Sequence, residues 1–182
     1  MTNVQYYFSL SLPSNSEKMK RILGMGSALV DILIRMQDDA PLEKLGLPKG
    51  SMQLVDRERR DAVLEFFSGQ EKNLAAGGSA ANTIHGIGKL GGAAGFIGMT
   101  GEDELGKRFL NDMKDAGVEV FLSRSDTATG CAISLISPDS ERTFATYLGA
   151  ASELSEQHLP SSIGMPYEIL HLEGYLAAFL QL

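Results

Sequence analysis

The sequence is short of cysteine and of basic residues, and both shortages exclude function classes. Cys131 is the only cysteine in 182 residues, so no intrachain disulfide can form, and the chain suits a reducing compartment such as the cytoplasm. Lys and Arg number 16 against 23 Asp and Glu, which gives a formal net charge of −7. This charge argues against a nucleic-acid partner and against an anionic membrane surface.

Long apolar runs are missing as well. No stretch approaches the roughly 20 apolar residues that a membrane-spanning helix needs. Residues 1–18 lack a basic segment, and serines break their apolar part, so they do not read as a signal peptide. Because they show no hydrophobic period, we predict a loose N-terminal extension over 1–18, with Met19 as an alternative start of translation.

Short apolar runs alternate with amphipathic segments through the rest of the chain, and hydrophobic residues make up 43% of it, enough for a packed core. The runs typical of buried strands are 22–27, 93–99, 118–122 and 168–173. Helices are expected over 56–67, 79–90, 100–117 and 152–159. This β-α-β rhythm predicts a mostly parallel sheet with helices on its faces.

The pattern changes after residue 128. Apolar runs over 129–137 and 142–148 flank a Pro-Asp-Ser-Glu turn, which predicts an antiparallel hairpin. We assign this hairpin, with strands near 30–36 and 51–55, to a second, antiparallel sheet that stands off the first as a lid. The predicted fold class is therefore α/β, with a Rossmann-type parallel sheet and a small lid in one domain over 19–182.

Residues 75–92 read AAGGSAANTIHGIGKLGG and form the segment around which the chain is organised. Gly77 and Gly78 precede a helix whose first turn holds Ser79, the expected N-cap, and Asn82. A helix N-terminus presents unpaired N–H groups and partial positive charge, and glycines let a ligand approach the backbone closely. The segment suits a polyhydroxylated or anionic small ligand; the alternative is a glycine turn before a core helix.

Asp31 is the one charge within the apolar run 28–34. A carboxylate there is costly unless it is exposed or partnered. It is either an acceptor for ligand hydroxyls, at the strand ends where open α/β sheets bind ligands, or an edge position facing water. The glycines at 77–78 show neither the G-x-G-x-x-G spacing of a dinucleotide fingerprint nor a following G-K-[ST] of a P-loop, which disfavours a Rossmann-type oxidoreductase.

Seven sequence blocks together resemble the N-terminal half of a PfkB/ribokinase-family kinase, from about Met19 to Leu176. The blocks are GSALVD at 26–31, AGGSAAN at 76–82, LGG at 90–92, FIGMTGEDELG at 96–106, TGCAI at 129–133, SPDSERTF at 137–144 and HLEGYL at 171–176. The AGGSAAN block has Ser79 where ribokinases tend to have lysine, and it is most similar to bacterial adenosine-kinase-like members.

The resemblance implies a phosphotransferase that acts on a sugar or nucleoside hydroxyl. It implies that Asp31 accepts hydrogen bonds from the ribose hydroxyls. It also implies that Gly77, Gly78 and Asn82 hold the same sugar from the other side. Glu173 falls near a family acid that lines the substrate and metal region.

Family members carry about as much chain again, and that half holds the catalytic base, the acidic motif associated with Mg²⁺ and most of the ATP site. ATP and Mg²⁺ are therefore implied as cofactors whose main sites are not encoded here, and no catalytic residue is assigned. We expect a fragment or an interrupted reading frame that lacks kinase activity by itself. The alternatives are a non-catalytic ligand-binding module that forms a homodimer through the lid, or a fragment of a ribokinase- or fructokinase-like sugar kinase.

Overall fold

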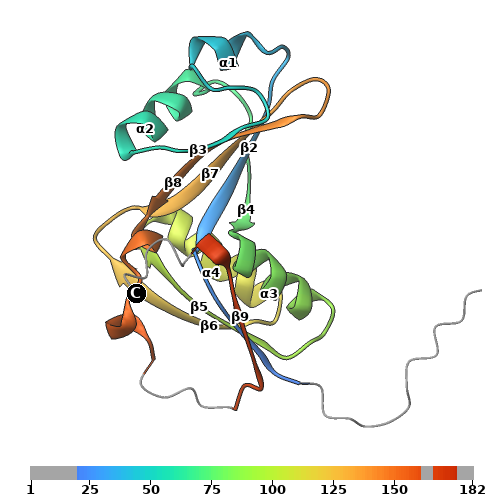
Figure 1. Ribbon diagram of the computed structural model, residues 1–182, viewed down its shortest axis with the longest axis vertical. Coiled ribbons are helices and arrows are strands. Elements are labelled where there is room, and N and C mark those ends of the chain that lie inside the picture. The colour runs from blue at the N-terminus through green and yellow to red at the C-terminus, as the bar shows by residue number, and fades with distance from the viewer. Residues whose placement is uncertain (1–19, 161–165, 176–182) are drawn as a thin grey trace, which may run out of the picture.

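The computed structural model describes residues 20–160 and 166–175, and the extension expected over 1–18 lies outside them. The described residues form two sheets (Figure 1). The first sheet has four strands in the order β6–β5–β1–β9, all of them parallel. Its strands are β1 (Ile22–Met25), β5 (Ala94–Gly101), β6 (Glu119–Ser125) and β9 (Ile169–Leu172). The predicted parallel sheet is thereby confirmed.

Two amphipathic helices, α3 (Ser79–Lys89) and α4 (Glu104–Asp115), pack on one face of this parallel sheet. Phe96 of β5 lies in the cluster that joins them, and its ring centroid is 5.6 Å from that of Phe109 in α4. All eight residues of β5 are buried, as expected for a central parallel strand. These contacts fix the end of α3 that faces the second sheet.

The second sheet, termed the lid sheet, has five strands in the order β3–β8–β7–β2–β4. They are β2 (Leu29–Arg35), β3 (Met52–Leu54), β4 (Asn73–Gly77), β7 (Thr129–Ile136) and β8 (Arg142–Gly149). The β7–β8 pair is antiparallel as expected, and so is the pair that β2 forms with β4, a strand that was not expected, whereas β2–β7 and β3–β8 are parallel. The lid sheet is therefore mixed rather than antiparallel throughout.

One face of the lid sheet is covered by α1 (Ala40–Lys44) and α2 (Arg57–Phe66), which lie at its outer end (Figure 1). Alternate residues of β2 and β7 form a core with these helices, namely Ile32, Ile34, Cys131, Ile133 and Leu135 packed with Val63 and Phe67. Burial raises the pKa of the Cys131 thiol to about 11. Because strand side chains alternate between faces, Asp31 and Leu33 lie on the opposite, open face.

Two segments near the lid sheet were not expected from the sequence. Residues 40–44 form α1, where the sequence predicted no helix, and α1 buries Leu42. A helix of five residues is too short to show a hydrophobic period. Strand β4 reads Asn-Leu-Ala-Ala-Gly, a composition with weak strand preference, so its pairing with β2 decides its conformation.

The helix expected near 152–159 is wrong. The chain instead forms two short 3₁₀ turns, Ala150–Glu153 and Glu156–His158, separated by the two extended residues Leu154 and Ser155. The side chain of Ser155 accepts a hydrogen bond from the backbone at His158 and so caps the second turn. Serine competes in this way with a continuous helix, which explains the interruption.

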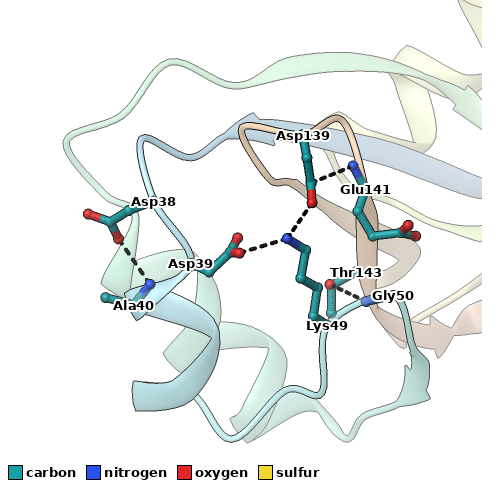
Figure 2. Close-up of polar contacts among 8 residues, drawn as sticks. All are labelled: Asp38, Asp39, Ala40, Lys49, Gly50, Asp139, Glu141 and Thr143. Carbon is teal, nitrogen blue, oxygen red and sulfur yellow. Dashed lines mark hydrogen bonds and ion pairs between the residues drawn. The ribbon is translucent and has the colours of Figure 1, made fainter.

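An ion-pair bridge holds the outer end of the lid sheet (Figure 2). Lys49 Nζ lies 2.7 Å from a carboxylate oxygen of Asp39, just before α1, and 2.7 Å from one of Asp139, in the β7–β8 turn. Next to it, the backbone N–H of Gly50 donates to the hydroxyl of Thr143 at 3.0 Å. These contacts fasten the α1 segment to the tip of the β7–β8 hairpin.

A second set of contacts joins the lid sheet to the parallel sheet. Asp103, the N-cap of α4, accepts hydrogen bonds from Gly106 N at 2.9 Å, from Thr129 N at 2.8 Å and from the Thr129 hydroxyl at 2.6 Å. The same hydroxyl accepts from Gly101 N at 2.9 Å. Although partial burial pushes the pKa of Asp103 upward, the hydrogen bonds from Thr129 and Gly106 hold it below its ordinary value. One carboxylate thus ties the start of α4 to the first residue of β7.

Replacing Asp103 by alanine should lower the free energy of unfolding by about 2–4 kcal/mol, because a cap worth about 1 kcal/mol and two hydrogen bonds from Thr129 are lost together. Urea denaturation of the two chains measures the difference. Asp56→Ala is the matched control, since Asp56 caps α2 through Arg59 N at 2.7 Å and should cost only about 1 kcal/mol. Equal losses in the two variants would contradict the joining role of Asp103.

Candidate functional site

The candidate site lies where β2, the start of α3 and the end of β9 come together. Asp31 is the third residue of β2, paired in register with Ala75 of β4 and Ala132 of β7. These small neighbours leave its carboxylate half-buried on the open face of the lid sheet. Burial raises the pKa of Asp31, and the positive charge of Arg142 opposes that rise without cancelling it.

Gly77 and Gly78 form the passage from β4 into α3, and each meets another part of the chain at contact distance. A β-carbon at Gly77 would overlap the carboxylate of Asp31. A β-carbon at Gly78, whose φ is +100°, would overlap the carbonyl oxygen of Ser27. The two glycines therefore allow Asp31 and the chain after β1 to lie directly against the start of α3.

The cap of α3 differs from the one expected. Gly78 is the N-cap residue, Ser79 is the first helical residue, and no side-chain hydrogen bond from the N-cap position closes the helix. The expectation that Ser79 caps α3 is wrong. Asn82, in the first turn, is exposed, and its backbone N–H donates to Gly78 O at 2.8 Å. Its amide side chain is therefore available at the same end of the helix as Asp31.

Glu173 supplies the missing cap from the residue that follows β9. One carboxylate oxygen accepts from Ala80 N at 3.0 Å, and the other accepts from Ser27 N at 2.7 Å. The residue is only 7% exposed. Gly26 makes room for it, because a β-carbon there would lie 2.8 Å from the carboxyl group. Sequence reasoning placed Glu173 near a substrate and metal region, and the structure places it on backbone N–H groups at the mouth of α3.

The structure thus brings four of the predicted residues into one continuous arrangement. Asp31 contacts Gly77, Gly78 contacts Ser27, and Glu173 binds both Ser27 and Ala80. Asn82 lies one turn from Gly78 on the same helix. Sequence reasoning missed Gly26 and Ser27, although both stand in the GSALVD block and a close backbone approach is the usual reason for such a glycine.

Two other features do not coincide with this arrangement. A G-x-G-x-x-G spacing occurs at 86–91, where α3 ends, whereas a dinucleotide fingerprint must open a helix. A hollow of about 290 Å³ lies at the far end of β2 and β4, and its lining contains none of the predicted site residues. The candidate site is therefore identified by its carboxylates and by the start of α3, and not by the volume of a cavity.

Within residues 20–160 and 166–175, no group of three His, Cys, Asp or Glu side chains is placed to hold a metal ion. None of the helices described there is long and apolar enough to cross a membrane. The site of the described part therefore consists of two carboxylates, one amide and the backbone at the start of α3. Such groups accept and donate hydrogen bonds to a polar ligand.

Comparison with known proteins finds several kinases that are similar to this chain. The adenosine kinase from Sinorhizobium meliloti is 33% identical with a TM-score of 0.75, and the match covers 87% of this chain and 48% of that one. The 5-dehydro-2-deoxygluconokinase of Photobacterium profundum is 32% identical over 125 residues, 67% of this chain and 37% of that protein. The aminoimidazole riboside kinase of Salmonella typhimurium is 38% identical over 89 residues, 46% of this chain and 28% of that protein.

The chain spans about half the length of the solved adenosine kinase and about a third of the two curated relatives. The parallel sheet with its mixed lid sheet is the ribokinase-like kinase fold over that length. Residues 52–181 match the family model described as pfkB family carbohydrate kinase. Because this match extends over most of the sequence, the chain belongs to the pfkB family of carbohydrate kinases.

Proposed function

We propose that this chain is the acceptor-binding half of a kinase that transfers the γ-phosphate of ATP to a hydroxyl of a sugar or nucleoside, with an adenosine-like nucleoside as the leading candidate. The observation that carries the proposal is the Asp31 carboxylate lying against Gly77, at the helix start that also presents Asn82. Names of the relatives, an adenosine kinase and a riboside kinase among them, support the acceptor class.

The proposed chemistry follows from the donors and acceptors at the mouth of α3. A carboxylate accepts hydrogen bonds only, so Asp31 suits a pair of neighbouring hydroxyl groups. The Asn82 amide both donates and accepts, so it suits the ring oxygen or a further hydroxyl. Gly77 and Gly78 carry no side chains, so the Asp31 carboxylate lies directly against the backbone that leads into α3. Together these groups orient a polyol without forming a bond to it.

The phosphoryl donor enters the proposal through the family, which uses ATP, with Mg²⁺ as the ion that such transfers require. No three-residue metal cluster is present among the described residues, so they do not fit the ion by themselves. No residue of the candidate site is assigned as the base that takes the hydroxyl proton. We therefore propose that this chain binds the acceptor in the cytoplasm and does not turn it over alone.

A homodimer through the open face of the lid sheet is part of the proposal. Strand register places Met52 beside Phe144 and Leu54 beside Thr146, on the face that carries Asp31. Met52 is 48% exposed and Leu54 63% exposed, and β3 is an edge strand. Exposed apolar side chains on a sheet edge favour pairing with another chain. The same feature supports the second candidate, a ligand-binding module that acts by dimerising.

Asp31→Asn should weaken adenosine binding at least tenfold, because the amide removes a charged hydrogen-bond acceptor of the same shape. Isothermal titration calorimetry measures the dissociation constant. Asp115→Asn, an exposed acid at the end of α4, is the matched control and should leave binding unchanged. Unchanged affinity in Asp31→Asn would exclude Asp31 as a sugar ligand, and a loss in both variants would point to net charge instead.

The raised pKa of Asp31 predicts a pH dependence. Its carboxylate form is lost as pH falls through a value above the ordinary aspartate pKa of about 3.9, so adenosine affinity should decline from that higher pH. Arg142→Gln removes the charge that opposes the rise, so the pKa of Asp31 should move further upward. Carbon-detected NMR titration of the carboxyl group reads the pKa directly. A downward shift in Arg142→Gln would contradict the assignment.

The double variant Met52→Ser, Leu54→Ser should shift the chain from dimer to monomer, because two apolar side chains on the lid edge become polar. Sedimentation velocity at micromolar concentration and physiological salt measures the association state. Leu90→Ser, at an exposed position after α3, serves as the control and should remain a dimer. A monomeric parent chain, or a double variant that still dimerises, would rule out the lid interface.

A further inference from the structure

The buried carboxylate of Glu173 has a role in addition to stabilising the fold. Both of its oxygens are engaged by backbone N–H groups, from Ser27 at 2.7 Å and from Ala80 at 3.0 Å. The two donors belong to elements that are far apart in sequence, 146 and 93 residues from Glu173. The residue therefore fixes the chain after β1 and the start of α3 relative to each other.

The location of this carboxylate is the place where an anion would bind. The first N–H groups of α3 have no carbonyl partner from a preceding helical turn, and they lie at the positive end of an eleven-residue helix, which together attract phosphate and carboxylate groups. No side chain at the N-cap position closes this end. Glu173 contributes a negative charge there, at 7% exposure, and it uses the Ala80 N–H that a phosphate oxygen would need.

A second carboxylate strengthens the effect. Asp31 lies against Gly77, immediately before the N-cap, so a second acid stands near the same helix start. A negative charge in a partly buried place repels an anion more strongly than it would in water. Neutral hydroxyl groups meet no such repulsion, and the remaining lone pairs of Asp31 can accept from them.

We propose that Glu173 is a positioning and specificity residue: it aligns Ser27 with the start of α3 and makes this end of the site reject anions, so that the acceptor is an uncharged sugar or nucleoside rather than a sugar phosphate. The inference rests on the proposed function for the identity of the ligand. The rejection of anions does not depend on that function, because it follows from the carboxylates of Glu173 and Asp31 at the start of α3.

A purely structural cap predicts something different. If Glu173 only closed the helix, its replacement by glutamine would lower stability and leave the ligand preference unchanged. Under our proposal, Glu173→Gln keeps the shape of the side chain and removes the charge, and it leaves one amide oxygen for the two N–H groups that now donate to two carboxylate oxygens. The variant should then gain affinity for anions, which a structural role would not produce.

The experiment uses inorganic phosphate as the probe and follows the backbone N–H signals of Ser27 and of residues 79–82 by ¹⁵N NMR. The wild-type chain should show no saturable shift up to millimolar phosphate. Glu173→Gln should bind phosphate at least tenfold more tightly, with shifts confined to the start of α3. Glu168→Gln is the matched control, because it removes the same charge from an exposed acid that accepts from Arg21 N at 3.0 Å, and it should gain nothing.

The variant Glu173→Asp distinguishes an effect on stability from an effect of charge, because it keeps the charge and shortens the side chain. Glu173→Asp should melt at a lower temperature and still reject phosphate. Saturable phosphate binding to the wild-type chain at these N–H groups would overturn the proposal even if Glu173→Gln failed to fold. An equal gain in Glu168→Gln would overturn it as well, because net charge would then explain the effect.

An adenosine titration distinguishes this inference from the proposed function. Failure of adenosine to bind the wild-type chain contradicts the proposed function, while phosphate binding that appears only in Glu173→Gln still supports the rejection of anions. The other result is that the wild-type chain binds adenosine while the wild type and Glu173→Gln bind phosphate equally. In that case the proposed function stands, and the role of Glu173 in specificity is contradicted.

Discussion

Backbone N–H groups at the boundary between the two sheets are satisfied by carboxylates, and the rest of the structure depends on this. Asp103 accepts from Thr129 and Gly106, and Glu173 accepts from Ser27 and Ala80. Asp112 of α4 accepts from Ala76 of β4 at 2.9 Å. Without them, buried donors would each cost about 1–3 kcal/mol. The acids thus determine how the lid sheet sits on the parallel sheet, and with it the position of Asp31.

The same boundary explains why the site and the fold cannot be separated. Gly77 and Gly78 have no room for a side chain, because Asp31 and Ser27 occupy it. The cap of α3 must therefore come from elsewhere, and Glu173 provides it. The residues proposed to bind a ligand therefore lie among those that hold the fold together. An experiment that substitutes them must measure ligand binding and stability separately.

The sequence predicted the elements that show a clear period, and it failed where tertiary contacts decide. The parallel strands, α2, α4 and the β7–β8 hairpin have apolar residues at regular spacing. Strand β4 and α1 are too short or too weakly patterned to be read locally. The cap of α3 was misassigned to Ser79, because the true acceptor lies 93 residues away in the chain.

Cys131 has a practical consequence for studying this protein. Its sulfur is fully buried in the core between the lid sheet and α2, and burial raises its pKa to about 11. Only the thiolate reacts readily with alkylating reagents, and very little of it exists at neutral pH. A cysteine introduced at the tip of the β7–β8 hairpin would therefore take up a fluorophore or spin label alone, without mutating the native thiol. The wild-type sequence is, in this sense, already a clean background for spectroscopic distance measurements on the lid sheet.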